Sequence, residues 1–306
     1  MEKKRLSILY IKLQFNLLFE EDTILPEEKV SALRGGMGEM LLRQNCVNDR
    51  ICEECVFESA CIVRKTMYTY MEKKPSFMQG NDSVGYLIEC EEYRKNIKAG
   101  DTVTFYLTLF GNNIVYFGQY VQAFSQLGMY GIGKNKSRYI IWEIKNMFGQ
   151  SILKNDIIQM EYFIPEYISD YVERRKKELY LYGCQNTLIF HTPLSLKFHG
   201  EYLQKYSAEG ILTALFRRIQ MLDYFCEIYL DYPECKIFPE IIMQSVKKKR
   251  IYRYSSTQDS KICLTGIEGF VTLDKIPEEY LGYILAGEIL HIGKNSSFGF
   301  GRYEVR

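Results

Sequence analysis

Residues 286–305 read AGEILHIGKNSSFGFGRYEV, which predicts the end of an apolar helix, a glycine-rich loop and a short final strand. The string GIGKN at 131–135 stands in the same setting, after one helical pattern and before the strand pattern RYIIWEI at 138–144. The repeated G-K-N between a helix and a strand is the strongest internal repeat in the chain. It predicts two copies of one domain plan.

The patterns around the two loops agree with this plan. Both halves run strand, helix, strand or hairpin, helix, glycine loop, strand, which is the β-α-β-β-α-β order of a ferredoxin-like domain. In the first half the elements are expected at 5–19, 31–44, 101–111, 112–128 and 138–144. In the second half they are expected at 186–198, 208–225, 250–256, 261–274, 276–292 and 302–306.

The expected fold class is therefore α+β, with two tandem ferredoxin-like (RRM-like) domains and an inserted cysteine-rich segment. We place the N-terminal domain at 1–150, with its cysteine cluster at 46–61, and the C-terminal domain at 183–306. Residues 151–182, which contain the charged run ERRKKE, are the expected connection, with that run on a solvated helix face.

Composition sets the class of protein. The 306 residues are 47% hydrophobic and 25% charged, with 39 Lys and Arg against 38 Asp and Glu, which excludes disordered, collagen-like and coiled-coil chains. A net charge of +1 means that any polyanion must be held by a local basic cluster. The sequence shows no secretion signal and no apolar run of membrane-spanning length, so we expect a cytoplasmic protein without a membrane partner.

The two glycine loops are candidate phosphate sites. Glycine permits positive φ angles, and successive exposed backbone N–H groups form a concavity that binds anions. The alternative is that both loops are tight turns that end a helix. Neither loop matches GxxxxGK[ST], which excludes a nucleotide P-loop. The candidate residues are Gly131, Gly133, Lys134, Lys136, Arg138, Gly293, Lys294, Asn295, Ser296, Ser297, Phe298, Gly299, Gly301 and Arg302.

Further basic residues lie outside the loops and alternate with tyrosines. This mixture suits RNA, because Lys and Arg bind phosphates while Tyr stacks on unpaired bases; a merely solvated surface is the alternative. The candidate RNA contacts are Arg217, Arg218, Lys248, Lys249 and Arg250, with Lys247, Tyr252, Arg253 and Tyr254 beside them.

Three strings together resemble the CRISPR-associated repeat-processing endoribonucleases of the RAMP superfamily. They are the C-terminal loop at 286–305, GIGKNKSRY at 131–139, and LRGGMGEML at 33–41 followed by spaced cysteines. The C-terminal loop is the specific part, and the combined order covers most of the chain outside 62–100 and 150–182. The resemblance implies tandem ferredoxin-like domains, binding of CRISPR repeat RNA, cleavage of the precursor transcript into guide units, and other CRISPR-associated proteins as further partners.

Cleavage of RNA without a metal needs a base, an acid and positive charge around the phosphate, since the 2′-hydroxyl itself is the nucleophile. Of the three histidines, His291 directly precedes the glycine loop and is the first catalytic candidate. Arg34 and Tyr303 are expected to assist. His191 and His199 flank a strand and are assigned to structure, because neither neighbours an obvious acid partner or nucleophile.

The resemblance also raises a difficulty. Many of these endoribonucleases place the catalytic histidine on or just after the first helix, where this chain has Glu39 between Arg34 and Arg43 and no histidine. Three accounts stay open: His291 or another residue took over, Arg, Lys and Tyr support slow cleavage by positioning, or the protein binds RNA as a non-cleaving subunit of an effector complex. A metal nuclease built on the Glu234-Cys235-Lys236 fragment is the remote rival.

Four of the nine cysteines follow the spacing Cys46-x5-Cys52-x2-Cys55-x5-Cys61. Four thiolates complete a tetrahedral site, and C-x2-C is the usual knuckle, so a structural zinc ion is expected. An iron–sulfur cluster and a metal-free segment are the alternatives. Four protein ligands leave no open position, so no catalytic metal is expected at this cluster.

Overall fold

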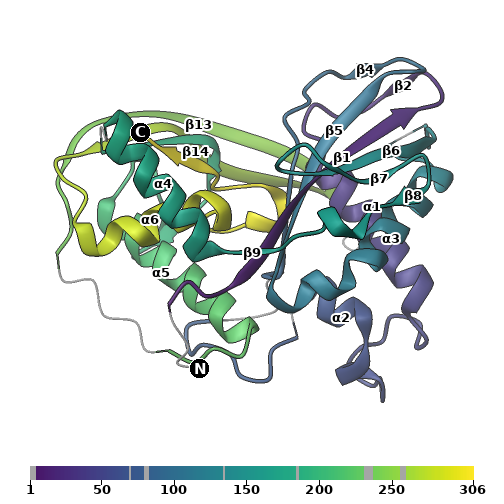
Figure 1. Cartoon of the computed structure of the whole chain (residues 1–306), viewed down its shortest axis with the longest axis horizontal. Helices are drawn as coiled ribbons and strands as arrows, with labels where there is room; N and C mark the ends of the chain where they lie inside the picture. The colour runs from purple at the N-terminus through teal and green to yellow at the C-terminus, as the bar shows by residue number, and fades with distance from the viewer. Residues whose placement is uncertain are drawn as a thin grey trace. The chain divides into compact units, whose positions relative to one another are not determined.

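The computed structural model describes residues 5–68, 70–78, 83–133, 135–183, 186–230, 237–255 and 260–306 (Figure 1). It divides into two compact units, which we call the N-terminal unit, Tyr10–Pro165, and the C-terminal unit, Met1–Leu9 with Glu166–Arg306. The division falls inside 151–182, the predicted connection. The chain start joins the C-terminal unit because the backbone amide of Ile168 donates to the carbonyl oxygen of Ile8 over 3.0 Å.

The N-terminal unit is built on one antiparallel sheet in the order β3-β5-β1-β6-β7-β8. Its first strand lies between the third and the fourth strand of the motif, as a ferredoxin-like domain requires. On β1, Phe15 pairs with Phe105 on one side and with Ile144 on the other. The strands are β1 (Leu9–Phe19), β3 (Tyr86–Glu89), β5 (Thr102–Phe110), β6 (Tyr139–Asn146), β7 (Ser151–Lys154) and β8 (Ile157–Ile158).

Two helices, α1 (Val30–Asn45) and α3 (Phe117–Tyr130), cover this sheet. The ring of Phe124 lies 5.4 Å from that of Phe15 and 4.8 Å from that of Phe105, which places α3 on the buried face. The smaller elements of the unit are β2 (Thr23–Ile24), η1 (Glu58–Ala60), α2 (Ile62–Thr66), β4 (Asn96–Ile97), η2 (Gly111–Tyr116) and η3 (Met160–Tyr162).

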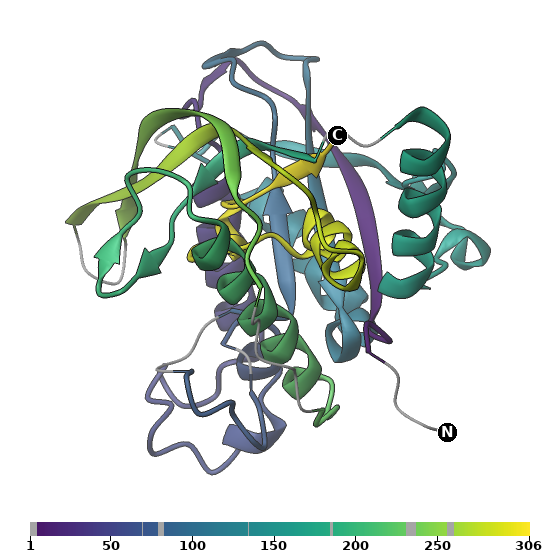
Figure 2. The ribbon, with the colours of Figure 1, turned by 90° about the vertical axis from the view of Figure 1, so that its left-hand side faces the viewer.

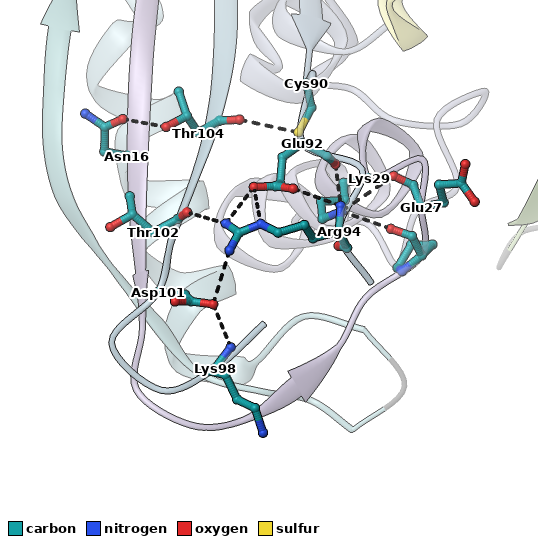
Figure 3. A network of polar contacts seen from close by, with 11 residues as sticks. Asn16, Glu27, Lys29, Cys90, Glu92, Arg94, Lys98, Asp101, Thr102 and Thr104 are labelled. Atoms are coloured by element: carbon teal, nitrogen blue, oxygen red, sulfur yellow. Dashed lines mark hydrogen bonds and ion pairs between the residues drawn. The ribbon is translucent and has the colours of Figure 1, made fainter. Parts of the chain in front are cut away.

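A buried lysine fixes the start of α1 (Figure 3). Lys29 is 1% exposed, and its Nζ donates to the carbonyl oxygens of Glu92 and Arg94 over 2.7 Å each. Removal from water disfavours the charged amine and lowers the pKa of Lys29. Four backbone carbonyls surround this ammonium group in all, and they take the place of the lost water.

The C-terminal unit repeats the plan with the sheet order β13-β14-β10-β15. Its most extended part is the β13–β14 hairpin, a long twisted ribbon in Figure 2, in which Lys247 pairs with Glu268 and Ser255 with Ser260. The strands are β9 (Glu166–Tyr167), β10 (Thr187–Leu194), β11 (Lys197–Phe198), β12 (Glu201–Tyr202), β13 (Ile241–Ser255), β14 (Ser260–Leu273) and β15 (Tyr303–Val305). The helices are α4 (Ile168–Tyr182), α5 (Ala208–Phe225), α6 (Glu278–Leu290) and η4 (Ser296–Phe298).

One buried carboxylate joins α4, α6 and β15. Glu288 on α6 is 2.9 Å from the Nε of Arg175 on α4, and it accepts a hydrogen bond of 2.7 Å from the backbone amide of Val305 on β15. Its Oε2 also accepts the Tyr171 hydroxyl over 2.7 Å. Helix α4 is thus packed into the C-terminal unit and is not a free linker.

The prediction of tandem ferredoxin-like domains is confirmed by these two strand orders. None of the helices in the described parts of the chain has the length and apolarity needed to cross a bilayer.

Candidate nucleic-acid interface

The C-terminal glycine loop lies against strand β10. The amide of Lys294 donates to the carbonyl oxygen of Ser195 over 2.7 Å, and the amide of Gly301 donates to that of Pro193 over 3.0 Å. The two ends of the loop also bond to each other, since the amide of Ile292 donates to the carbonyl oxygen of Gly301 over 3.1 Å. The loop is therefore a fixed extension of the sheet.

The glycines allow this close approach. A Cβ on Gly301 would lie 1.8 Å from the carbonyl oxygen of Ile292, and a Cβ on Gly293 would lie 2.6 Å from that of Ser195. Both positions also have φ values that L side chains rarely adopt, +73° and +84°. Packing and backbone conformation therefore both require glycine at the two ends of the loop.

The expected backbone cradle for an anion is not present at most of the loop amides. The amides of Ile292, Lys294, Phe298, Gly299, Phe300 and Gly301 all donate to backbone carbonyls within the protein. An amide that is already paired in this way does not face a phosphate. For these six amides the interpretation as an anion concavity is corrected, because each is paired with a carbonyl oxygen of the protein.

The loop side chains meet aromatic and basic partners from other elements of the same unit. The Nζ of exposed Lys294 lies 5.5 Å from the ring centre of Tyr202, and the guanidinium of Arg253 on β13 lies 4.8 Å from that of Phe298. Asn295 has a φ of +64° and is partly exposed. The predicted contacts Ser296 and Ser297 are buried, and they pack under the loop.

The base of the β13–β14 hairpin adds the largest cluster of cations. Lys247, Lys248 and Arg250 are exposed, and Lys249 is partly exposed. A cavity of about 170 Å³ lies beside them, lined by Lys248, Lys249, Arg250, Ser195, Tyr202 and Gln204 among others. The loop and the hairpin base therefore share Ser195 and Tyr202 as neighbours. We call the set of Tyr202, Lys248, Lys249, Arg250, Arg253, Lys294 and Phe298 the loop–hairpin surface.

The first-half loop also has glycines with positive φ angles. Gly131 has a φ of +85°, and a Cβ there would lie 1.9 Å from the carbonyl oxygen of Lys136. Gly133 also has a positive φ, +79°, and Lys134 lies outside the described residues. Arg138 lies 3.9 Å from the carboxylate of Glu21 and 4.0 Å from that of Glu20, so nearby acids offset its charge.

The two arginines of α5 that were predicted to contact RNA differ in exposure. Arg217 is exposed, whereas Arg218 is 5% exposed and its Nε donates to the carbonyl oxygen of Leu290 over 3.1 Å. That bond satisfies one of the last carbonyls of α6. The Arg218 side chain is therefore used inside the unit and offers no surface to a ligand in this conformation.

Two of the three predicted catalytic side chains are buried. His291 follows α6 with a φ of +53°, is 1% exposed, and has its Nδ1 3.2 Å from the carbonyl oxygen of Phe300. Tyr303 is 2% exposed and donates its hydroxyl to the carbonyl oxygen of Ile284 over 2.5 Å. Burial raises the pKa of Tyr303 well above its usual range. Both side chains hold the loop and β15 in place, and their catalytic roles stay predictions.

Arg34, the third candidate, lies on α1 in the N-terminal unit. Its Nη2 donates to the Oγ of Ser83 over 2.9 Å, and its guanidinium lies 6.0 Å from the ring centre of Tyr86. Glu39, also on α1, accepts hydrogen bonds from Arg43 and Arg50 over 2.8 Å each. Burial raises the pKa of Glu39, but the hydrogen bonds from the two arginines outweigh it, so that the pKa is lowered and a carboxylate is held there.

The histidines assigned to structure are the exposed ones. The Nε2 of exposed His191 lies 3.3 Å from Oε2 of Glu304, and the backbone amide of His191 donates to the carbonyl of Arg302 at the end of the glycine loop. His199 is also exposed. Glu304, the partner of His191, was not predicted, because the two residues are far apart in sequence and the pairing of β10 with β15 brings them together. The fragment at 234–236 lies outside the described residues.

Two family models match the chain. One, described as an N-terminal domain, matches residues 6–163, and the other, described as CRISPR-associated endoribonuclease Cas6, matches residues 188–303. Residues 188–303 therefore form a Cas6-type domain. The second match covers the glycine loop, both strands of the hairpin and α5, so the loop–hairpin surface lies within the Cas6 domain.

Solved Cas6 structures share the fold. A Cas6 product complex has a TM-score of 0.54 at 13% identity, covering 97% of this chain and 99% of that one. Thermus thermophilus Cas6 has a TM-score of 0.51 at 11% identity, covering 98% and 99%. A chain of a partial Cas6-RT-Cas1–Cas2 complex reaches 0.57 at 11% identity, with 98% of this chain covered.

The chain spans 46% of that last chain and 29% of the corresponding chain in a second Cas6-RT-Cas1–Cas2 structure. A search of curated proteins finds no significant match.

The packing of the loop on β10 predicts a large cost for a side chain at Gly301. We expect Gly301→Ala to lower the free energy of unfolding by about 3 kcal/mol, because it adds a clash with the Ile292 carbonyl to the strain of a positive φ. Gly200→Ala is the matched control, since Gly200 has a φ of +87° but open space around it. Urea denaturation of both variants measures the difference, and equal losses would contradict the packing argument.

Proposed function

We propose that this chain binds CRISPR repeat RNA across the loop–hairpin surface and cleaves the precursor transcript into guide units. The observation that carries the proposal is the meeting of Lys294 and Phe298 from the loop with Arg253 from the hairpin and Tyr202 from β12, inside the region that matches the Cas6 domain. Cations bind the phosphates, and the rings of Tyr202, Tyr252 and Phe298 offer stacking faces to unpaired bases.

The chemistry we propose needs no metal. The 2′-hydroxyl attacks the adjacent phosphate, the bond to the 5′-oxygen of the next nucleotide breaks, and the products carry a 2′,3′-cyclic phosphate and a 5′-hydroxyl. A base takes the proton of the 2′-hydroxyl and an acid returns a proton to the leaving oxygen. Arginine and lysine side chains stabilise the extra negative charge of the phosphorane.

Among the histidines, exposure favours His191 for proton transfer. Its ring is accessible, its Nε2 is oriented by Glu304, and its backbone borders Arg302. His291, the candidate that the sequence favours, is enclosed and has its Nδ1 against the Phe300 carbonyl. We therefore propose His191 as the proton-transfer group and His291 as a positioning residue that shapes the end of α6 and the loop.

A non-cleaving RNA-binding subunit is the second candidate. It is favoured by the burial of both His291 and Tyr303 and by the carboxylate of Glu39 in place of a histidine on α1. The matched chains whose titles name a Cas6-RT-Cas1–Cas2 complex support a further proposal, that other CRISPR-associated proteins are partners of this chain.

Removing two hairpin cations tests RNA binding. We expect Lys248→Ala with Arg250→Ala to weaken binding of a labelled repeat RNA about tenfold at low salt, and to reduce the slope of log K against log salt by about 1.5, because each lost phosphate contact removes about 0.7 to 0.9. Fluorescence anisotropy at several salt concentrations measures both quantities. The control is Lys177→Ala with Lys275→Ala, two exposed cations outside this surface, which should change neither.

The histidine variants test cleavage. In excess EDTA, we expect the wild type to release a product ending in a 2′,3′-cyclic phosphate, and His191→Ala to cleave about 10²- to 10⁴-fold more slowly with unchanged RNA affinity. His291→Asn should keep most of the activity, because Asn tolerates the positive φ and can still donate to the Phe300 carbonyl.

Gel separation of end-labelled RNA reads all three proteins in one assay. Full activity of His191→Ala with loss in His291→Asn would return the catalytic role to His291. Tight binding without any product from the wild type would identify the non-cleaving subunit.

A further inference from the structure

The segment from Cys46 to Cys61 lacks a hydrophobic core of its own. None of its residues is buried, and its one regular element is the three-residue turn η1. Apolar side chains such as Val56, 87% exposed, and Val47, 73% exposed, face outward. Ordering such a segment costs conformational entropy that apolar burial does not offset here, so another interaction must hold it.

The four cysteines of this segment share one cavity with apolar residues such as Ile51 and Phe57. Cys46, Cys52, Cys55 and Cys61 all line one cavity of about 280 Å³, and none of them is in a disulfide. The Sγ of Cys46 already accepts a hydrogen bond of 3.2 Å from the backbone amide of Arg50. Four thiols that are spread over sixteen residues of the chain thus line one cavity.

Two arginines border the cavity. Arg50 and Arg64 both line it, and each also pairs with a carboxylate, Arg50 with Glu39 and Arg64 with Glu58.

We propose that Cys46, Cys52, Cys55 and Cys61 bind one Zn²⁺ as four thiolates in a closed tetrahedral site. Each thiol that coordinates loses its proton to solvent, and the resulting cluster carries a charge of −2 that Arg50 and Arg64 offset. The described residues hold no group of three or more His, Cys, Asp or Glu already arranged as a metal site, so binding of the ion requires the four thiols to come closer together.

The site gives this segment a structural role. Cys46 is the residue that ends α1, and Cys61 is the residue that precedes α2. A metal held by both would fix the end of one helix to the start of the other and order the turns between them. Four protein ligands leave no open position, so the ion takes no part in catalysis.

Metal analysis of the purified full-length chain, grown with zinc and iron both present, tests the site. We expect one zinc per chain by plasma mass spectrometry, and less than one fifth of that in Cys52→Ser with Cys55→Ser. The matched control is Cys263→Ser, which removes an exposed cysteine on β14 and should keep full zinc content. Treatment of the wild type with a strong chelator should lower its melting temperature by more than 5 °C, and zinc should restore it.

Three results would overturn the proposal. They are a wild-type chain without stoichiometric metal, a chain with iron and inorganic sulfide, and zinc that persists in the double variant. None of these readouts depends on RNA binding or cleavage. The zinc proposal can therefore fail while the proposed function holds, and the reverse also applies.

Discussion

The close packing of the C-terminal glycine loop on β10 is the constraint on which the candidate interface depends. Because Gly301 and Gly293 let the loop backbone contact neighbouring carbonyl oxygens, the loop is held by hydrogen bonds at both ends. Lys294 and Phe298 are consequently presented in fixed positions, toward Tyr202 and Arg253. His291 and Tyr303 support the same geometry from inside the unit, through their bonds to the carbonyls of Phe300 and Ile284.

Charge pairing explains how a chain with a net charge of +1 can hold a polyanion. Many cations outside the loop–hairpin surface lie close to carboxylates: Arg138 near Glu20 and Glu21, Arg43 and Arg50 on Glu39, and Arg175 on Glu288. For Lys248, Arg250 and Lys294 the described residues provide no such carboxylate partner. No neighbouring carboxylate therefore offsets the positive charges of these three side chains at the surface.

The sequence predicted the fold well because the hydrophobic periodicities are strong. The helix expected at 208–225 is α5 with the same bounds, and the two strand orders are those of the predicted motif. The division of the chain at residue 165 depends instead on tertiary contacts, such as Arg175 with Glu288, that no local pattern contains. The charged run at 173–178 predicted a solvated helix face, whereas Arg175 within it is partly buried and pairs with the buried Glu288.

The site was predicted less well, because side-chain burial and pairing depend on distant residues. His291 was predicted as catalytic because it adjoins the glycine loop in sequence. The same position, between the end of α6 and a closely packed loop, buries its imidazole ring. Likewise, the Arg217-Arg218 pair gave no sign that one side chain would bond to α6. A strand-alternation argument could have found His191, since Leu188 and Phe190 are buried on β10 and the alternating residue is expected to face outward.

Ultraviolet cross-linking of a repeat RNA to the full chain, followed by mass spectrometry of the linked peptides, tests the central claim most directly. The account predicts cross-links in peptides that contain Tyr202, Tyr252 or Phe298, and their loss when unlabelled repeat RNA competes. Cross-links confined to peptides of the N-terminal unit, or none that a repeat RNA competes away, would contradict the assignment of RNA binding to the loop–hairpin surface.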